Sequence, residues 1–167
     1  MLVLSDLDAS RRFAPDRLRV LREYAIRAAV ADPGQQATWL SIEETGDDLA
    51  SLQNVLIRVL LLDGDPIGFG MAQLETTPRL TALYIHPDFQ RRGYGRKILT
   101  ALSADLMATG AATVATAAAA PAQPFYLALG FQRRFSYSAS PTGWEQGPRM
   151  YFHHMTAPIP ALGFIST

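Results

Sequence analysis

The 167-residue sequence contains no cysteine, no excess of either charge and no long apolar run. The absence of cysteine excludes disulfides, thiolate nucleophiles and cysteine metal sites. Fifteen basic residues balance fifteen acidic ones, so no global field attracts nucleic acid or an anionic membrane. No stretch approaches the roughly 18 apolar residues of a membrane span, and the start lacks the pattern of a secretory signal. We therefore expect one cytoplasmic domain that buries its own core.

The most informative segment is 83–99, where an apolar strand pattern stops and a basic glycine turn leads into a helical pattern. The first backbone N–H groups of that helix have no partners, and the helix dipole adds partial positive charge at the same end. Gly93 and Gly95 remove side chains that would keep a phosphate away from those groups. Four cations surround the turn: Arg91, Arg92, Arg96 and Lys97. The segment therefore predicts an anion site suited to a pyrophosphate.

Two familiar phosphate loops do not fit this turn. The P-loop needs a Lys-Ser/Thr pair directly after its second glycine, and the dinucleotide fingerprint needs a third glycine where Ile98 stands. The pattern Gln-x-x-Gly-x-Gly at 90–95, after a strand ending in Ile-His-Pro at 85–87, instead resembles the acetyl-CoA loop of the GNAT superfamily of N-acetyltransferases. A glycine turn with a solvated charge run is the alternative, which the coincidence of these features disfavours.

A second segment, 121–131, supports the same resemblance. Pro121 suits the first position of a short helix, and Gly130 suits the residue just past its end. The spacing Phe-Tyr-x-x-x-Gly-Phe at 125–131 matches an element of the GNAT superfamily, in which a tyrosine hydroxyl lies close to the thioester sulfur. The resemblance implies that Tyr126 is the general acid for the departing thiolate. A packed aromatic is the alternative interpretation.

The resemblance also implies an α/β (α+β) fold: a mixed, mostly antiparallel central sheet of about seven strands with helices on both faces. Strands are predicted at 2–5, 55–62, 67–74, 80–86, 111–117, 131–138 and 149–155, with a hairpin turn at Asp63-Gly64. Helices are predicted at 15–30 (inner face Leu18, Leu21, Ala25 and Ala28), 35–44, 93–109 and around Tyr126. The GNAT-like domain is expected to cover 1–156, followed by an apolar tail at 157–167 that the family does not predict.

Acetyl-CoA is the cosubstrate that the resemblance implies, and no metal is expected. The fourth and fifth strands would splay apart, and pantetheine would bond to backbone groups near Leu83 and Ile85. A backbone N–H near Leu83 would stabilise the developing oxyanion. The residues expected to contact the cosubstrate are Leu83, Tyr84, Ile85, Gln90, Arg91, Arg92, Gly93, Tyr94, Gly95 and Arg96. His153 and His154 are strand neighbours that face opposite sides, so they do not form a metal pair.

The general base is less determined. Many GNAT relatives place a glutamate on the fourth strand, and residues 79–83 contain none. Glu75, at the end of the preceding strand, is the nearest carboxylate in the sequence and the first candidate for the catalytic base, with an ordinary surface residue as the alternative interpretation. The alternatives are Glu43, Glu44, His86 and His154.

The acceptor is expected to be a small-molecule amine or a peptide, with Trp39, Met71 and Tyr137 as pocket residues or, equally, as core. Three functions stay open. The first is an acetyl-CoA-dependent N-acetyltransferase. The second is a non-catalytic acyl-CoA-binding or sensing module, motivated by the missing strand glutamate and the alanine run at 117–120. The third is an assembly protein, motivated by the apolar tail, which would cover the protein's own surface or a partner subunit in a homodimer. A disordered end is the alternative interpretation of this tail.

Overall fold

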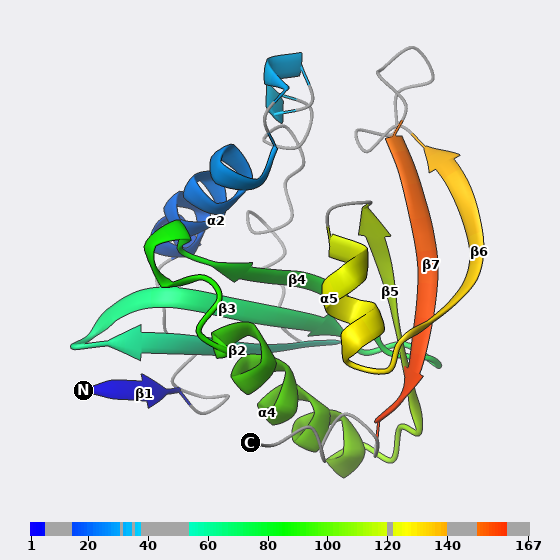
Figure 1. Cartoon of the computed structure of the whole chain (residues 1–167). Coiled ribbons are helices and arrows are strands. Elements are labelled where there is room, and N and C mark those ends of the chain that lie inside the picture. Colours follow the sequence, from blue (N-terminus) through cyan, green and yellow to red (C-terminus); the bar gives the residue numbers. More distant parts are fainter. Residues whose placement is uncertain are drawn as a thin grey trace.

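The computed structural model describes residues 1–5, 15–30, 32–34, 36–37, 54–119, 122–139 and 150–159. Within these residues, one seven-stranded sheet has the order β1-β2-β3-β4-β5-β7-β6 (Figure 1). Its strands are β1 (Leu2–Leu4), β2 (Val55–Leu62), β3 (Asp65–Gln73), β4 (Arg79–Ile85), β5 (Thr113–Ala119), β6 (Gln132–Ala139) and β7 (Met150–Pro158). Neighbouring strands are antiparallel except β4 and β5, which are parallel. The predicted mixed, mostly antiparallel sheet is confirmed.

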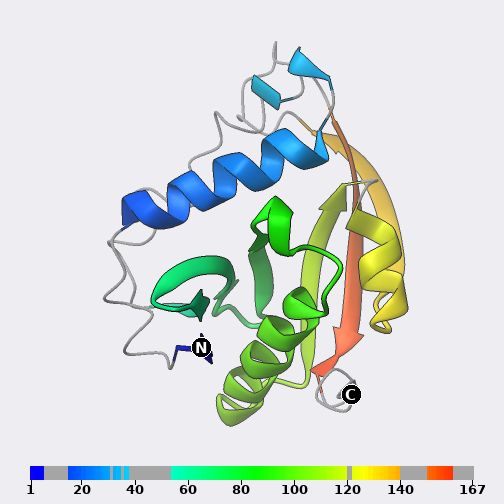
Figure 2. The same ribbon diagram turned by 60° about the vertical axis from the view of Figure 1, so that its left-hand side comes forward.

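Helices cover both faces of the sheet. They are α2 (Pro15–Ala29), the 3-10 turn η3 (Pro87–Phe89), α4 (Tyr94–Ala108) and α5 (Gln123–Ala128). Helix α2 lies on one face and α4 on the other (Figure 2). The α2-side core is formed by Leu18, Leu21, Val55, Ile57, Val59, Phe69, Met71 and Ala82. The α4-side core includes Leu60, Leu80, Ile98, Leu102, Val114, Ala118, Tyr126, Phe131, Met155 and Ile159.

Local sequence explains the elements around the hairpin of β2 and β3. Strand β2 is a run of branched apolar residues whose alternate side chains enter the two cores, as the period-2 geometry of a strand requires. Asp63 and Gly64 both have positive φ, 51° and 89°, which is the requirement of a type I′ turn. The hairpin predicted from this dipeptide is confirmed.

Helix α2 departs from its predicted inner face in one residue. Leu18, Leu21 and Ala25 are buried as predicted, and Ile26 joins them. The prediction for Ala28 was wrong, because residues 27–29, at the end of the helix, are all exposed.

The end of the chain contains more strand than predicted. Strand β7 continues to Pro158, and Ala157 pairs with Val114 of β5. The Ile159 side chain is fully buried, and its N–H donates to Ala112 O at 2.9 Å. The first residues of the expected tail therefore belong to the sheet and the core. Residues 160–167 lie outside the described residues.

One ion pair ties the sheet to α4. The Arg58 guanidinium on β2 donates to both carboxylate oxygens of Asp105 on α4, at 2.7 and 2.6 Å, and to Ser5 O at 2.9 Å. Both side chains are largely buried, with exposed fractions of 18% and 11%. One side chain of β2 thus links helix α4 with the residue that follows β1.

The described residues include no helix that is both long enough and apolar enough to cross a bilayer. The predicted helix at 35–44 falls almost entirely outside the described residues, as do Trp39, Glu43 and Glu44.

Candidate active site

Strands β4 and β5 pair only where they begin. Arg79 pairs with Ala115 and Leu80 with Thr116, and the Thr116 hydroxyl donates to Leu80 O at 3.2 Å. The remaining residues of β4 have no partner on β5, so the two strands separate (Figure 1). The splay that the resemblance implied is confirmed.

A β-bulge explains why β4 leaves β5. In the pairing of β3 with β4, Met71 lies opposite Ala82 and Ala72 lies opposite Leu80. Thr81 is therefore an extra residue on β4, and a bulge of this kind bends the strand and increases its twist. The bulge immediately follows the last residue of β4 that pairs with β5. No prediction from the sequence includes this bulge, because a bulge is a property of the register between two strands.

Backbone groups of β4 face the gap beyond the bulge. The His86 N–H donates to Ile67 O on the β3 side at 2.8 Å. Because backbone groups alternate along a strand, Leu83 and Ile85 direct theirs away from β3, toward the gap. Ile85 O accepts a hydrogen bond from Gln90 Nε2 at 3.0 Å. Leu83 therefore presents its backbone groups to the gap, whereas the Ile85 carbonyl already has a side-chain partner.

The turn between β4 and α4 ends in a row of N–H groups. The first hydrogen bond of the helix joins Lys97 N to Gly93 O at 3.0 Å. Earlier in the turn, the N–H groups of Asp88, Phe89 and Gln90 donate to His86 and Pro87. Among the described residues, no acceptor receives a hydrogen bond from the N–H groups of 91–96. The orphan donors predicted for the start of this helix are present.

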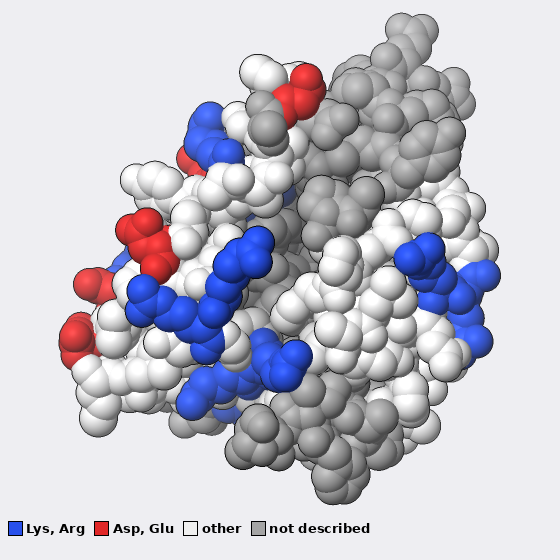
Figure 3. Space-filling model, in the orientation of Figure 1, with Lys and Arg blue, Asp and Glu red and all other residues white. Residues whose placement is uncertain are grey.

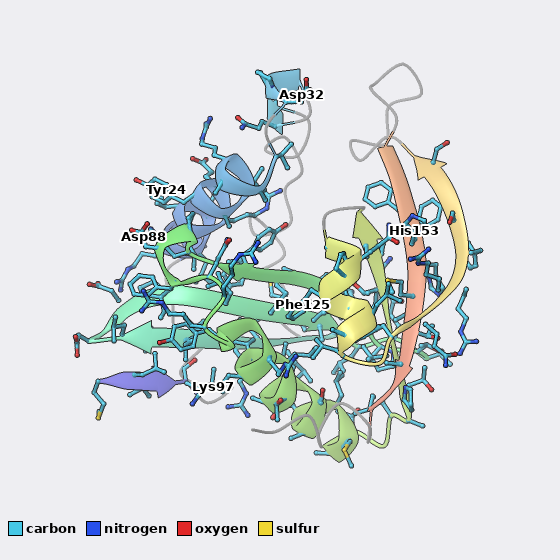
Figure 4. All side chains as sticks on the ribbon, in the orientation of Figure 1. Tyr24, Asp32, Asp88, Lys97, Phe125 and His153 are labelled. Carbon is cyan, nitrogen blue, oxygen red and sulfur yellow. The ribbon has the colours of Figure 1, made fainter. Side chains whose placement is uncertain are left out.

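The cations around these donors are solvent-exposed. Figure 3 shows Lys and Arg side chains gathered over the start of α4, and Figure 4 labels Lys97 there. Arg92 donates to Asp88 O at 3.3 Å and its guanidinium lies 5.6 Å from the Phe89 ring centre. None of Arg91, Arg92, Arg96 and Lys97 forms an ion pair with a carboxylate in the described part of the chain. Their charge thus reinforces the positive potential of the helix terminus.

Gly93 and Gly95 of the turn differ in what a side chain at each position would meet. Gly93 has φ 80°, a conformation that strains any other L-residue, and a Cβ built there meets nothing within 4 Å. A Cβ on Gly95 would lie 3.4 Å from the ring of Phe125, which reaches from α5 toward the first turn of α4 (Figure 4). A Cβ at this position would thus be in ordinary contact with Phe125, and the role of Gly95 beside a phosphate stays a prediction.

Two further glycines, on β3, set the position of α4. A Cβ on Gly68 would lie 2.6 Å from Ile85 Cδ1, and one on Gly70 would lie 2.8 Å from side-chain atoms of Ile98 and Leu102. A side chain at Gly70 would force the Ile98 and Leu102 side chains of α4 to shift, and one at Gly68 would displace mainly Ile85 of β4. The two glycines therefore permit the close packing of these side chains on β3. No prediction from the sequence includes this pair, although two glycines spaced by two in one strand indicate close approach on one face.

Helix α5 places Tyr126 on the same face as α4. Tyr126 is 8% exposed, and its ring lies 5.2 Å from that of Phe125 and 5.1 Å from that of Phe131. Gly130 has φ 95° just beyond the helix, as predicted. The helix begins at Gln123 with Pro124 in its first turn, rather than at Pro121, which is outside the described residues.

The other expected site residues lie apart from one another. Glu75 is in the exposed turn between β3 and β4, and its carboxylate is 3.3 Å from the Arg79 guanidinium. Met71 is 2% exposed within the α2-side core, so the core interpretation of this residue holds and its surface is closed to an acceptor. Tyr137 is half-buried on β6, stacked on Phe152. Within the described ranges, no three His, Asp or Glu residues gather as metal ligands do.

Solved structures share this architecture. A GCN5-related N-acetyltransferase from Rhodopseudomonas palustris is 23% identical over 95% of this chain and 94% of its own, with a TM-score of 0.75. The PaiA N-acetyltransferase from Thermoplasma acidophilum, solved with coenzyme A, is 14% identical over 95% and 99%, with a TM-score of 0.72. The ribosomal-protein-S18-alanine N-acetyltransferase from Escherichia coli is 24% identical over 95% and 94%, with a TM-score of 0.62. No curated protein matches this sequence.

The sequence itself also matches a protein family. Residues 53–133, from β2 to the start of β6, match the acetyltransferase (GNAT) domain. This range contains both the gap between β4 and β5 and the donor-rich turn. The resemblance to the GNAT superfamily is thus confirmed, and the chain has a GNAT fold.

Proposed function

We propose that this protein transfers an acetyl group from acetyl-CoA to a primary amine by direct attack within a ternary complex. The observation that carries the proposal is the row of free N–H donors at 91–96 beside a strand that leaves its neighbour at a bulge. A phosphate-binding helix terminus and an open strand edge are the two features that an extended nucleotide thioester needs. The coenzyme A of the PaiA structure supports the same choice of ligand.

The chain's own groups suffice to hold such a ligand. The N–H groups of 91–96 would bind the diphosphate, and the surrounding cations Arg91, Arg92 and Arg96 would lower the cost of bringing its charge there. The backbone of Leu83 would bond to pantetheine as an added strand does. Tyr84, Gln90 and Tyr94 would border this path, with Gln90 holding the turn through Ile85 O.

Tyr126 is proposed as the general acid. Its helix packs on β5, one edge of the gap, and its ring is held between Phe125 and Phe131. A tyrosine hydroxyl at this edge would give its proton to the departing thiolate, and an N–H near Leu83 would stabilise negative charge on the carbonyl oxygen. Cysteine is absent, so no acyl-cysteine forms, and positioning of the two substrates supplies most of the acceleration.

Glu75 is the proposed base, acting through water. Its carboxylate lies beside Arg79. Arg79 is the first residue of β4 that pairs with β5, at the closed end of the gap between these strands. Glu75→Gln should lower kcat with little change in the Kd of acetyl-CoA, and Arg79→Gln is the control for loss of the ion pair alone. An unchanged kcat in Glu75→Gln would remove this residue from the mechanism.

The function is tested by the release of free CoA from acetyl-CoA with a panel of primary amines. Tyr126→Phe keeps the ring contacts and removes only the hydroxyl. We expect kcat to fall about 100-fold with the Kd of acetyl-CoA unchanged, since general acid catalysis contributes on the order of 10²–10⁴. Tyr24→Phe, an exposed residue of α2, is the matched control.

A sensing module on the same fold predicts a different result. It is favoured by the lack of a carboxylate on β4 and by the pairing of Glu75 with Arg79. Acetyl-CoA would then raise the melting temperature, and no amine would release CoA above the rate in buffer. That outcome would overturn the acetyltransferase proposal and keep the cosubstrate site.

A further inference from the structure

The turn that precedes the donor-rich segment is held largely by His86. Its Nδ1 accepts a hydrogen bond from the Asp88 N–H at 3.2 Å, and its carbonyl accepts one from the Phe89 N–H at 2.9 Å. The next N–H, that of Gln90, donates to Pro87 O at 3.4 Å. Two of the three N–H groups of 88–90 therefore bond to this one residue.

The donor-rich segment needs this support because its first residue is strained. Arg91 has φ 61°, in the left-handed region that residues other than glycine adopt at a cost. Such a residue keeps this conformation only where its surroundings impose it. The first hydrogen bond of α4 reaches back only to Gly93, and the side chains of Gln90 and Arg92 add bonds within the turn at 3.0 and 3.3 Å. The orientation of the first N–H donors therefore depends on the turn that His86 holds.

The hydrogen bond from Asp88 fixes the protonation state of the His86 imidazole. A backbone N–H only donates, so Nδ1 carries no hydrogen, and the ring is neutral with its hydrogen on Nε2. Tyr24 of α2 contacts the imidazole through its ring, as Phe89 does, each at 5.6 Å between ring centres. Helix α2 and η3 meet at this point, where Figure 4 labels Tyr24 and Asp88. The His86 side chain is 28% exposed, so protons from solvent reach it.

Titratable and charged groups on three elements surround this ring. On η3, the Asp88 carboxylate lies 3.9 Å from Nδ1, and Arg92 donates to the carbonyl of the same residue. On the other side, the ring lines a hollow of about 390 Å³ together with Tyr24, Arg17 of α2 and Asp65 at the start of β3. Arg17 and Asp65 form an ion pair at 3.0 Å, so their charges largely cancel. Asp88 is therefore the carboxylate that a protonated ring would meet.

Resting on the proposed function, we propose that neutral His86 positions the N–H groups of 91–96 for the diphosphate of acetyl-CoA, and that protonation of its ring releases them. A protonated Nδ1 is a donor, so the Asp88 N–H loses its acceptor. The new ring N–H then bonds to the Asp88 carboxylate, which is 82% exposed, and an exposed pair of this kind contributes little. His86 is thus a positioning residue, and acetyl-CoA binds more tightly at high pH than at low pH.

Protonation also has an opposite effect, because an imidazolium attracts a diphosphate. Ile85 packs against the α4-side core, so its neighbour His86 lies toward α2, away from the start of α4. Exposed charges further apart than about 8 Å are largely screened at physiological ionic strength. Loss of a capping hydrogen bond, in contrast, shifts an equilibrium by about two- to thirtyfold. The release of the turn therefore determines the sign of the pH dependence.

The test uses two variants that differ at one side-chain atom. Asparagine has Oδ1 at the covalent position of Nδ1, so His86→Asn keeps an acceptor that does not titrate. Leucine has a methyl group at that position, so His86→Leu removes the acceptor. By isothermal titration calorimetry at about pH 8, we expect CoA to bind His86→Asn within about twofold of the wild type, and His86→Leu about three- to tenfold more weakly.

A second titration, at about pH 5.5, uses the range in which histidine side chains titrate. We expect the wild type to lose at least about threefold more affinity for CoA than His86→Asn, which retains every other titrating group of the protein and of CoA. His153→Asn is the control: it removes a histidine that bonds to Ser136 on β6, and it should follow the wild type. Equal losses in the wild type and His86→Asn, or tighter wild-type binding at the lower pH, would overturn the inference.

The free protein provides a readout that needs no CoA. In ¹⁵N NMR at about pH 8, the neutral His86 ring should carry its hydrogen on Nε2. On acidification, the Asp88 amide resonance should move with the same midpoint as the ring. A hydrogen on Nδ1, or an Asp88 amide that does not follow the ring, would contradict the proposed role. If the wild type binds no CoA at either pH, the proposed function fails, and this titration decides separately whether His86 holds the turn.

Discussion

The two glycines of the donor-rich turn should respond differently to the same substitution. Gly93→Ala adds a methyl group in open space, yet forces alanine to φ 80°. Gly95→Ala adds a methyl group at ordinary contact distance, 3.4 and 3.5 Å, from the Phe125 ring, at a φ that alanine accepts. The pair therefore separates backbone strain from bulk at positions two residues apart.

The expected loss of affinity in Gly93→Ala follows from the free-energy cost of the left-handed backbone conformation. That conformation costs a non-glycine residue roughly 1–2 kcal/mol, and asparagine or aspartate less. If the turn of Gly93→Ala relaxes in the free protein, only a fraction of the molecules has the strained conformation that binds acetyl-CoA. The apparent Kd is the intrinsic Kd divided by that fraction, so it rises. One to two kcal/mol then corresponds to roughly five- to thirtyfold weaker binding. For Gly95→Ala we expect less than about threefold, because ordinary contact distances cost little.

Isothermal titration calorimetry of CoA into each variant measures this directly. Gly93→Asn is a third variant, expected to bind between the wild type and Gly93→Ala because asparagine tolerates this region better. Weaker binding in Gly95→Ala than in Gly93→Ala would refute the reasoning. It would show that the volume of the side chain at position 95, and not the backbone conformation at position 93, controls the affinity for CoA.

Three stability predictions follow from the fold. Arg58→Ala leaves the Asp105 carboxylate, which is 11% exposed, without its guanidinium partner. It should lower the free energy of unfolding, measured by urea denaturation, by about 3–5 kcal/mol. Arg17→Ala breaks an exposed ion pair and should lower it by less than about 1 kcal/mol. Equal losses would contradict the burial argument. Gly70→Ala should cost about 1–3 kcal/mol by overpacking against α4, and a neutral result would contradict the close approach. Ile159→Ala should cost about 2–5 kcal/mol; a loss under 0.5 kcal/mol would place Ile159 outside the core.

The features predicted correctly from sequence are those fixed by local chemistry. Strand β2 was predicted residue for residue because a branched apolar run leads into Asp63-Gly64, a dipeptide that accepts positive φ at both positions. The start of α4 was predicted because a helix must leave its first N–H groups without partners. Both are decided within a few residues of chain, so the sequence is sufficient.

The missed features depend on pairs of elements. Thr81 is a bulge only relative to Met71 and Ala72 across the sheet. Ala157 and Pro158 belong to β7 and not to the predicted tail, because they pair with Val114 and Thr113 across the sheet, and proline is tolerated at the last position of a strand. The stacking of Phe135 on His154 likewise requires the register of β6 with β7. None of these follows from periodicity along one segment.

The central claim is that the main-chain N–H groups of 91–96 hold the diphosphate of CoA. The most direct test is a titration of ¹⁵N-labelled protein with CoA, followed through its amide resonances. We expect saturable shifts that are largest for Arg91 through Arg96, with smaller ones at Leu83. Saturable binding that leaves the amides of 91–96 in place, or no binding at millimolar CoA, would contradict the account.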